Sequence, residues 1–260
     1  DTANGFEYDS GKTATPYGHA KISTEQSKFG DGSTYFDGSG DYLETVNNVD
    51  FNFSNTPFSI DCQIKKSTQA GISCIISNDT CGTANSGFIL YTNNDILYFG
   101  GLTSSDLNSA VNIADNNWHH VEVDGTGSTI FLFIDGILKV SAPQLNVTPS
   151  QNLRIGRRNN NTGDYYGYID ELRISKGITR HVSNFTPPIA PYPSNNKPSI
   201  TVKTPGVNQT FSESTAFIPT IQVSDAENDS LTCKYYIDGE SHETRVITNT
   251  TSPQAVSFAS

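Results

Sequence analysis

The sequence predicts an all-β protein, and three observations support that prediction. Short runs of alternating apolar and polar residues recur along the 260-residue chain, which is the two-residue period of a half-buried strand. Turns rich in Asn, Gly and Asp separate these runs, and no amphipathic helical stretch of useful length occurs. Hydrophobic residues make up only 35% of the chain and 21 residues are Gly, which is typical of many turns and a thin core between two sheets.

The expected strands follow one another at short intervals. On the strand expected at 58–65, four apolar side chains share one face: Phe58, Ile60, Cys62 and Ile64. Further runs follow at 75–76, 88–91, 96–99, 121–123, 129–134, 137–140 and 153–155. On the strand expected at 165–175, Tyr168, Leu172 and Ile174 have the same parity. Arg173 and Ser175 have the opposite parity and should lie on the other face.

The same parity predicts the core and one hairpin. The apolar faces of the runs assign ten residues to the core: Phe36, Leu43, Phe58, Ile60, Ile64, Phe133, Leu153, Ile155, Leu172 and Ile174. Asp135 and Gly136 stand between two strand-like runs, and an Asp-Gly pair in that setting favours a two-residue turn. We therefore expect a tight hairpin at this position.

Four segments carry a family resemblance. They read Tyr-Phe-Asp-Gly-Ser-Gly-Asp-Tyr-Leu at 35–43, Trp-His-His-Val at 118–121, Phe-Leu-Phe-Ile-Asp-Gly at 131–136 and Tyr-Tyr-Gly-Tyr-Ile-Asp-Glu-Leu-Arg-Ile-Ser at 165–175. In this order and spacing, residues 1–193 resemble the laminin-G-like, concanavalin-A-like jelly roll. The resemblance implies a two-sheet jelly-roll sandwich. That fold carries lectins, adhesion modules, hydrolase-attached domains and some enzymes, so it does not by itself imply a function.

A second, smaller domain is expected after a proline-rich boundary. Residues 184–198 contain five prolines, which cannot donate to a strand ladder and favour extended geometry. We predict a first domain at 1–186, a linker at 187–198 and a second domain at 199–260. Residues 197–260 resemble immunoglobulin-like or fibronectin-type-III-like modules, which need about 100 residues. Only 64 residues remain (260 − 196), so we expect this β-sandwich to be incomplete.

Charge and composition narrow the class of partner. The net charge of −11 argues against nucleic acid, because phosphate contacts need clustered Lys and Arg. The acidity suits a soluble surface protein and sites for a hard cation. No run reaches the roughly 20 apolar residues of a membrane span, and no signal peptide is visible. The chain starts at Asp1, contains no Met and lacks the first apolar strand of the family, so we expect a processed or partial product of a longer polypeptide.

The four cysteines leave several pairings open. The spacing of Cys62, Cys74, Cys81 and Cys233 contains no zinc-type Cys-x-x-Cys pair. A hairpin centred near Thr68 would place Cys62 opposite Cys74, and Cys74 with Cys81 is the rival disulfide. Buried free thiols are the third alternative.

Enzyme chemistry is not expected. Retaining hydrolases of this jelly roll carry Glu-x-Asp-x-x-Glu on one strand, and Glu122 and Asp124 begin that pattern, but residue 127 is Gly. Asp170 and Glu171 are adjacent and should point to opposite faces. No nucleophile elbow or phosphate loop occurs.

The His119-His120 pair belongs to a segment that is a structural signature of laminin-G-like domains. We expect Trp118 to close one end of the sandwich and one of the two histidines to satisfy a buried hydrogen bond.

The family resemblance implies a calcium site. In relatives that hold the ion against the convex sheet, the residue matching Asp170 is a ligand with partners from the N-terminal region. Asp1 and Asp37 are the expected partners, because Ca²⁺ prefers carboxylate and carbonyl oxygens. The alternative is that Asp170 caps a strand end or pairs with an Arg.

A glycan site should combine aromatic rings with planar polar side chains. The richest segment is 157–166, and its candidate residues are Arg157, Arg158, Asn159, Asn161, Asp164, Tyr165 and Tyr166. A second candidate combines 78–81 with 91–95. The alternative is that both are merely solvated turns.

The resemblance also suggests a biological setting. Residues 177–180 and 184–193 look like the tail of laminin-G-like domains in tailed-phage structural proteins. We therefore expect a non-enzymatic adhesion module that binds a host or environmental glycan on a virion or tail protein, at a virion surface or extracellular. A structural decoration module, with virion or cell-surface proteins or further copies as partners, is one alternative. A carbohydrate-binding appendage of a secreted bacterial enzyme is the other.

Overall fold

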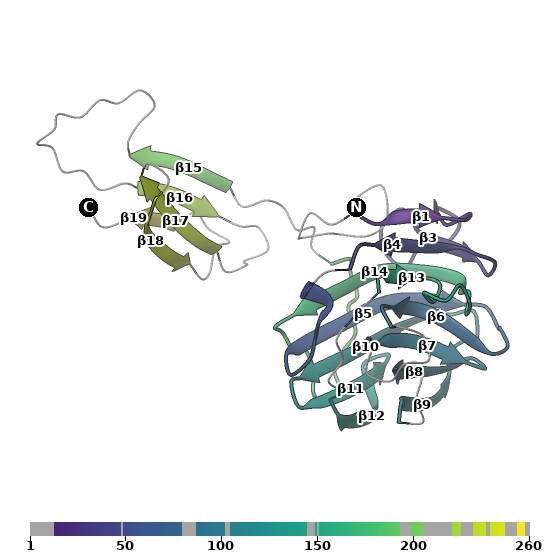
Figure 1. The fold of residues 1–260 in the computed structure, drawn as a ribbon. Helices are drawn as coiled ribbons and strands as arrows, with labels where there is room; N and C mark the ends of the chain where they lie inside the picture. The colour runs from purple at the N-terminus through teal and green to yellow at the C-terminus, as the bar shows by residue number, and fades with distance from the viewer. Residues whose placement is uncertain are drawn as a thin grey trace, which may run out of the picture. The chain divides into compact units, whose positions relative to one another are not determined.

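The computed structural model divides the chain into two units, Asp1–Tyr192 and Pro193–Ser260, each considered by itself (Figure 1). Its described residues are 13–47, 49–79, 87–101, 105–144, 149, 151–192, 199–204, 220–224, 231–237, 240–247 and 254–257. In these ranges no helix is long and apolar enough to cross a membrane. The single helical element among the described residues is a short 3-10 turn, η1 (Val49–Phe51).

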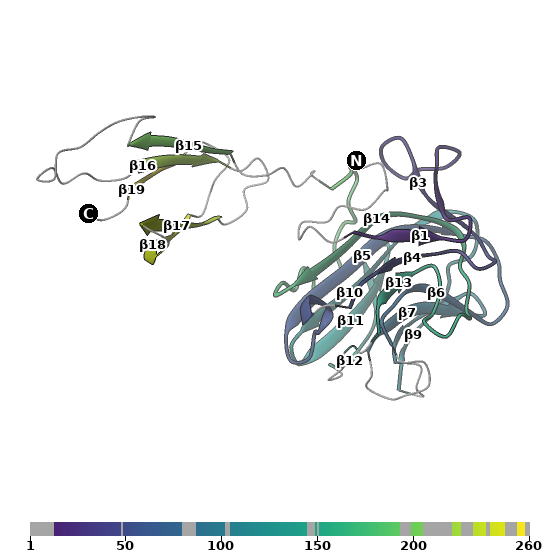
Figure 2. The same cartoon turned by 45° about the horizontal axis from the view of Figure 1, so that its top comes forward.

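The first unit consists of two seven-stranded antiparallel sheets that lie face to face (Figures 1 and 2). Sheet A has the order β1 (Thr15–Tyr17), β4 (Tyr42–Thr45), β13 (Leu153–Ile155), β6 (Ile72–Ser77), β7 (Ile89–Asn93), β8 (Ile96–Gly100) and β9 (Leu107–Asn112). Sheet B has the order β12 (Ile137–Pro143), β11 (Thr129–Ile134), β10 (Trp118–Thr126), β5 (Pro57–Lys66), β14 (Tyr166–Lys176), β3 (Ser33–Asp37) and β2 (Lys21–Ser23). The predicted all-β jelly-roll sandwich is confirmed.

Among the ten residues predicted for the core, one departs from the predicted parity. Nine of the ten predicted core residues are buried, and Ile174 is partly buried against the same cluster. Phe133 is buried, but it lies on the outer face of sheet B and not in the core as predicted, because Leu132 and Ile134 face the core. Its ring lies 5.3 Å from the ring of Phe185, on the outer face of sheet B.

A bulge in β14 explains a second departure from parity. The pairing of β14 with β5 shifts between Asp170 and Arg173, and Glu171 has a φ of 50°. Because a bulge inserts one extra residue, Leu172 lies in the core while Tyr168 lies on the outer face. The prediction that Tyr168 and Leu172 share one face is therefore wrong.

The hairpin prediction is confirmed. β11 and β12 pair on either side of Asp135 and Gly136, whose φ values are 51° and 73°. Positive φ at both central residues is the signature of the tight turn that an Asp-Gly pair favours.

One of the alternatives for the cysteines, a Cys62–Cys74 disulfide across a hairpin near Thr68, does not form. Cys62 lies on β5 in sheet B and Cys74 on β6 in sheet A, so the connection crosses between sheets instead of closing a hairpin. Cys62 is a free thiol in the core, and burial raises its pKa. Cys81 lies outside the described residues, so its pairing with Cys74 stays a prediction.

The segment 177–192, here called the strap, crosses the outer face of sheet B after β14. The Thr179 hydroxyl donates to the Gly125 carbonyl at 2.6 Å, and the Phe185 amide donates to the Gly136 carbonyl at 2.9 Å. At its end the Tyr192 amide donates to Glu171 at 2.6 Å. Residues 187–192, expected in the linker, thus belong to the first unit, which ends at Tyr192.

The second unit contains two small antiparallel sheets in its described residues. One consists of β15 (Ser199–Thr204), β16 (Thr220–Ser224) and β19 (Gln254–Ser257), and the other of β17 (Leu231–Ile237) and β18 (Glu240–Ile247). An apolar cluster of Val223, Cys233 and Val256 joins the two sheets. The immunoglobulin-like assignment and its incompleteness stay predictions.

Candidate functional site

Three segments of the first unit meet and form a surface that we call the rim: residues 17–19, 37–42 and 157–166. The Gly40 amide donates to Asp164 at 3.2 Å, and Asp37 is the strand partner of Tyr166. The first two segments join where Asp41 accepts the amide of His19. Contacts between such distant parts of the chain depend on the pairing of β3 with β14 and of β1 with β4.

The arginines of the rim are held in place by short polar contacts. Arg157 lies 2.8 Å from Asp164 and donates to the carbonyl of Asn161 at 2.7 Å. Arg154, the central residue of β13 and a neighbour of the rim, donates to the Asn161 side chain at 3.0 Å and to Glu44 at 2.6 Å. Asn161 itself has a φ of 62°, a conformation that Asn tolerates well. These contacts fix the positions of Arg157 and Asn161, and the assignment of this exposed turn as a glycan site stays a prediction.

An aromatic pair beside these arginines was not among the sequence-predicted residues. The rings of Tyr17 and Tyr42 stack at 4.6 Å with an angle of 9° between their planes. The Arg154 guanidinium lies 4.2 Å from the Tyr42 ring centre, and Tyr17 is 41% exposed. The signal in the sequence was the alternation around Leu43, which puts Tyr42 on the outer face opposite the core.

The two tyrosines at the end of the predicted glycan segment differ in how far they are exposed. Tyr165 is fully buried, and its ring packs edge-on against Phe36 at 5.9 Å. Its prediction as a sugar contact is wrong, because consecutive strand residues point to opposite faces. Tyr166 is 40% exposed and lies over Gly38, where an added Cβ would come within 3.1 Å of the Tyr166 Cβ.

Two further residues of that segment point away from solvent. Arg158 is 9% exposed, with its guanidinium 3.5 Å from the Thr162 hydroxyl. The Asn159 side chain donates to the Asn152 carbonyl at 3.1 Å. Of the seven predicted residues, the structure gathers four at the rim surface: Arg157, Asn161, Asp164 and Tyr166.

Two of the predicted calcium ligands, Asp170 and Asp37, are described, and they belong to different groups of contacts. Asp170 accepts backbone amides of Lys28 at 2.8 Å, Phe29 at 3.1 Å and Glu171 at 2.9 Å, which is the capping role named as the alternative. Burial raises the pKa of Asp170 although these amides act in the opposite direction. Among the described residues, no group of three or more metal-ligating side chains includes Asp170.

Asp37 lies at the rim instead. Its ligand atoms group with those of His19 and Asp41 within 4.8 Å of one another. Asp1 lies outside the described residues. Calcium binding therefore stays a prediction, and Asp37 is the predicted ligand with neighbouring ligand groups.

Most of the described residues of the second candidate are buried, while Asn94 is exposed and residues 80 and 81 lie outside the described residues. Asn78, Asp79, Tyr91 and Asp95 are each at most 5% exposed. Asp95 forms an ion pair with the buried Lys66 at 2.8 Å. A sugar cannot reach these groups in this arrangement.

The comparison with protein-family models decides the family. The model of the concanavalin A-like lectin/glucanase superfamily matches residues 37–179, more than half of the chain. The chain belongs to this superfamily.

Solved structures share the fold at low sequence identity. The receptor-binding domain of botulinum neurotoxin C/D mosaic serotype is 13% identical over 86% of this chain and 69% of its own, with a TM-score of 0.50. Domain 4 of the arabinanase AbnA from Geobacillus stearothermophilus, solved with arabinotriose, is 16% identical over 65% of this chain and 84% of its own, with a TM-score of 0.49. The botulinum neurotoxin serotype D binding domain is 18% identical over 64% of this chain, with a TM-score of 0.48. The chain spans 44% of the length of that domain.

No curated protein matches the chain.

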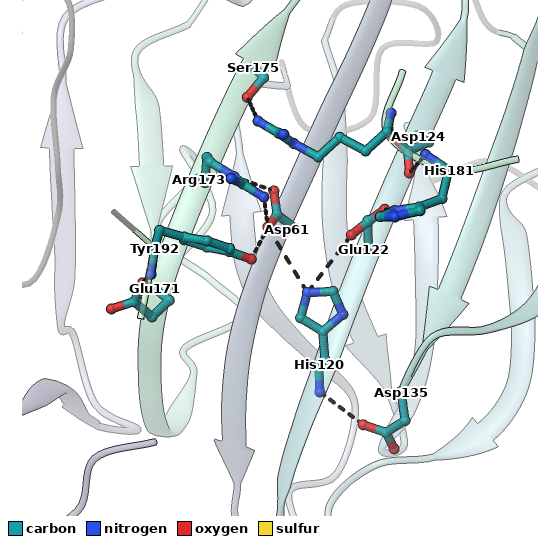
Figure 3. A network of polar contacts seen from close by, with 11 residues as sticks. Asp61, His120, Glu122, Asp124, Asp135, Glu171, Arg173, Ser175, His181 and Tyr192 are labelled. Atoms are coloured by element: carbon teal, nitrogen blue, oxygen red, sulfur yellow. Dashed lines mark hydrogen bonds and ion pairs between the residues drawn. The ribbon is translucent and has the colours of Figure 1, made fainter. Parts of the chain in front are cut away.

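The superfamily name covers both lectins and glucanases, so the acidic pair of β10 matters. Glu122 and Asp124 are 1% and 0% exposed, and the strap covers them, with Asp124 accepting the amides of Arg180 and His181 at 2.8 and 3.2 Å (Figure 3). Glycoside hydrolysis needs two carboxylates that reach the substrate. Glu122 and Asp124 cannot reach a substrate, because the strap covers them. Position 127, where the hydrolase pattern needs Glu, is Gly.

Proposed function

We propose that the first unit is a non-enzymatic carbohydrate-binding module and that the rim is its glycan site. The observation that carries the proposal is the juxtaposition of the Tyr17–Tyr42 stack with the ordered polar groups of Arg154, Arg157 and Asn161. Membership of a superfamily that contains lectins supports it.

The rim offers the two kinds of contact that a sugar needs. The exposed ring of Tyr17 can stack on the apolar CH face of a pyranose, and Asn161 and Asp164 can hydrogen-bond to hydroxyls at the edge. Arg154 and Arg157 already hold the loop in place through Asn161, so little ordering is needed on binding. Tyr166, beside Gly38, is a further exposed aromatic ring of the rim.

The more specific setting that we propose is a virion surface or tail-associated adhesin. The resemblance of residues 177–180 and 184–193 to phage laminin-G-like domains supports it. A decoration module that makes only protein contacts, and an appendage of a secreted enzyme, remain the alternatives. Labelling of purified virions with an antibody raised against residues 13–192 tests the virion setting, and unlabelled particles would contradict it.

The glycan site is tested with a glycan array followed by calorimetric titration of the best ligand. Replacing Tyr17 with Ala should weaken binding by about 1–3 kcal/mol, the effect of removing an aromatic anchor. Tyr98→Ala is the matched control, because Tyr98 stacks on Tyr91 at 5.2 Å and 19° but lies on β8. Equal loss in both variants would place the site elsewhere, and an array without any ligand would favour the decoration module.

The same titration tests the calcium prediction. Binding is measured with added Ca²⁺ and again with a chelator, for the wild type and for Asp37→Asn. Calcium-dependent binding that Asp37→Asn abolishes would support a rim ion that involves Asp37. Identical affinities in all four measurements would exclude a role for calcium at the rim.

A further inference from the structure

Three adjacent strands of sheet B place a row of charged side chains under the strap. The strand register pairs Glu122 of β10 with Asp61 of β5, and Asp61 in turn with Arg173 of β14. Asp61 and Glu122 are 0% and 1% exposed. Two carboxyl groups directly opposite each other on neighbouring strands cannot both be charged without a compensating positive group. Arg173 supplies one to Asp61, with contacts of 3.1 and 2.9 Å, but it bonds no oxygen of Glu122 in the described contacts.

His120 faces the gap between these carboxylates and makes no hydrogen bond there. Its side chain is 2% exposed, and neither ring nitrogen has a hydrogen-bond partner among the described residues. Its Nε2 lies 4.0 Å from Asp61 Oδ2 and 3.8 Å from Glu122 Oε2, which is too far for a hydrogen bond (Figure 3). The expectation that one histidine of the pair satisfies a buried hydrogen bond therefore fails for the buried one. A buried unsatisfied polar group of this kind calls for an explanation such as an unseen ion.

We propose that Nε2 of His120 and the carboxylates of Asp61 and Glu122 bind a divalent transition-metal ion. The ligand atoms of these three residues lie within 4.8 Å of one another. Around Zn²⁺, ligand atoms sit about 3.4 Å apart, as bonds of about 2.1 Å in a tetrahedron require, so the two gaps from Nε2, 4.0 and 3.8 Å, need to close by roughly 0.5 Å. An imidazole with two carboxylates suits Zn²⁺ or a neighbouring transition metal better than Ca²⁺.

The surrounding groups orient the ligands as metal sites require. Arg173 and the hydroxyl of Tyr192 bond to Asp61, and His181 Nδ1 lies 2.5 Å from Glu122. Such outer contacts fix the ligand side chains and are a regular part of protein metal sites.

Burial dominates the electrostatics of these ligands. It lowers the pKa of His120. Burial, together with the Asp124 carboxyl, raises the pKa of Glu122 to about 10. Among the other charged groups nearby, Asp135 raises the pKa of His120, whereas Arg173 lowers the pKa of both His120 and Glu122. Arg180 lowers the pKa of His181.

The strap would close over the ion. Phe185 stacks on His181 at 3.6 Å and meets His120 edge-on at 5.8 Å, while Tyr192 lies against Arg173 at 3.7 Å. Three protein ligands leave a fourth position on a tetrahedral ion, and because the strap covers the group, a substrate cannot reach that position. The ion would therefore fasten the strap to sheet B, and it is independent of glycan binding at the rim.

The test uses the full chain, stripped with a chelator and titrated with Zn²⁺ by calorimetry. The wild type should bind one ion per chain, and Co²⁺ in its place should show visible ligand-field bands. His120→Gln should weaken Zn²⁺ binding at least tenfold and remove these bands. His119→Gln is the matched control, because His119 contacts Asp135 and Asp115 at 2.7 and 3.1 Å outside this group. It should leave binding unchanged.

Two further measurements keep the proposal falsifiable if His120→Gln folds poorly. Glu122→Gln, nearly identical in shape, should also lose Zn²⁺ binding, and Zn²⁺ should raise the melting midpoint of the wild type by roughly 5 °C but not that of Glu122→Gln. His19→Gln probes a second described group, with Asp37 and Asp41, and His181→Gln probes a third, with Glu122 and Asp124. Absence of Zn²⁺ binding by the wild type, or its loss in His19→Gln with retention in Glu122→Gln, would overturn the proposal.

Discussion

Neighbouring residues can differ completely in what they do, and the example is Tyr165, just before β14, with Tyr166, the first residue of β14. Tyr165 is fully buried against Phe36, whereas Tyr166 is 40% exposed on the outer face. Their chemistry is identical, so the strand alone decides which of them stabilises the fold and which can meet a ligand.

Tyr165→Ala should therefore lower the free energy of unfolding by about 3–5 kcal/mol, because it leaves a cavity in the core. Tyr166→Ala should change it by less than about 1 kcal/mol. Urea denaturation of the two variants beside the wild type measures both values. Similar losses in the two variants would contradict the assignment of Tyr165 to the core.

His119 should make stability depend on pH. Its hydrogen bond to Asp135, and a second to Asp115, raise its pKa although burial opposes them. A histidine with a raised pKa stabilises the fold fully below its unfolded pKa of about 6.5 and loses that contribution as pH rises through the folded value.

His119→Gln should thus lower the free energy of unfolding by about 1 kcal/mol at pH 6 and by much less at pH 9. The expected loss of stability is small because the side chains of Asp115 and Asp135 are each 50% exposed. Urea denaturation at both pH values, with a chelator present, measures the difference. An equal loss at pH 6 and pH 9 would show that the ion pairs do not stabilise the fold.

At the scale of elements, the strap and the β11–β12 hairpin depend on each other. Gly136 in the hairpin turn has a φ of 73°, and a Cβ there would collide with the carbonyl oxygen of Phe185 in the strap. Gly71, between β5 and β6, has a φ of 74° with no atom within 4 Å of such a Cβ. The two glycines share one backbone conformation and differ only in the space beside them.

Gly71→Ala should consequently lower stability by about 1–2 kcal/mol, the strain of a positive φ for Ala. Gly136→Ala should lower it by about 3 kcal/mol or more, because the strap must also move. Thermal denaturation measures both. If the two variants lose the same stability, the strap does not pack on the turn as described.

At the scale of the whole molecule, the two units differ in the size of their cores. The core cluster of the first unit joins residues from both seven-stranded sheets, whereas the cluster of the second unit contains three buried residues among those described: Val223, Cys233 and Val256. Small cores support little stability, since unfolding then exposes little apolar surface.

Residues 197–260 expressed alone should therefore show no sharp, cooperative melt as a monomer. Residues 1–192, which end with the strap anchored by Tyr192, should keep the melting midpoint that the first unit has in the intact chain. Scanning calorimetry of the two fragments and the intact chain provides the comparison. A cooperative monomeric melt of 197–260 would show that the second domain is complete in itself.

The family and much of the fold were readable from local pattern. Period-2 alternation predicted the strands around Ile60, Phe133 and Ile155, the Asp-Gly pair predicted the hairpin, and four motifs in order predicted the jelly roll. Each of these signals is short-range, because strand periodicity and turn chemistry depend on a few neighbouring residues.

The tertiary structure alone decided what depends on distant contacts. The backbone amides of Lys28 and Phe29, more than 140 positions away in the sequence, donate to the Asp170 carboxylate. The strap buries Asp61 and Glu122. One inserted residue at the β14 bulge reverses the parity that placed Tyr168 in the core-facing set. No local pattern encodes such contacts, since they arise only when separate strands are registered side by side. The sequence by itself therefore determined the sandwich, and the packing of its strands decided which polar residues meet at the rim and beneath the strap.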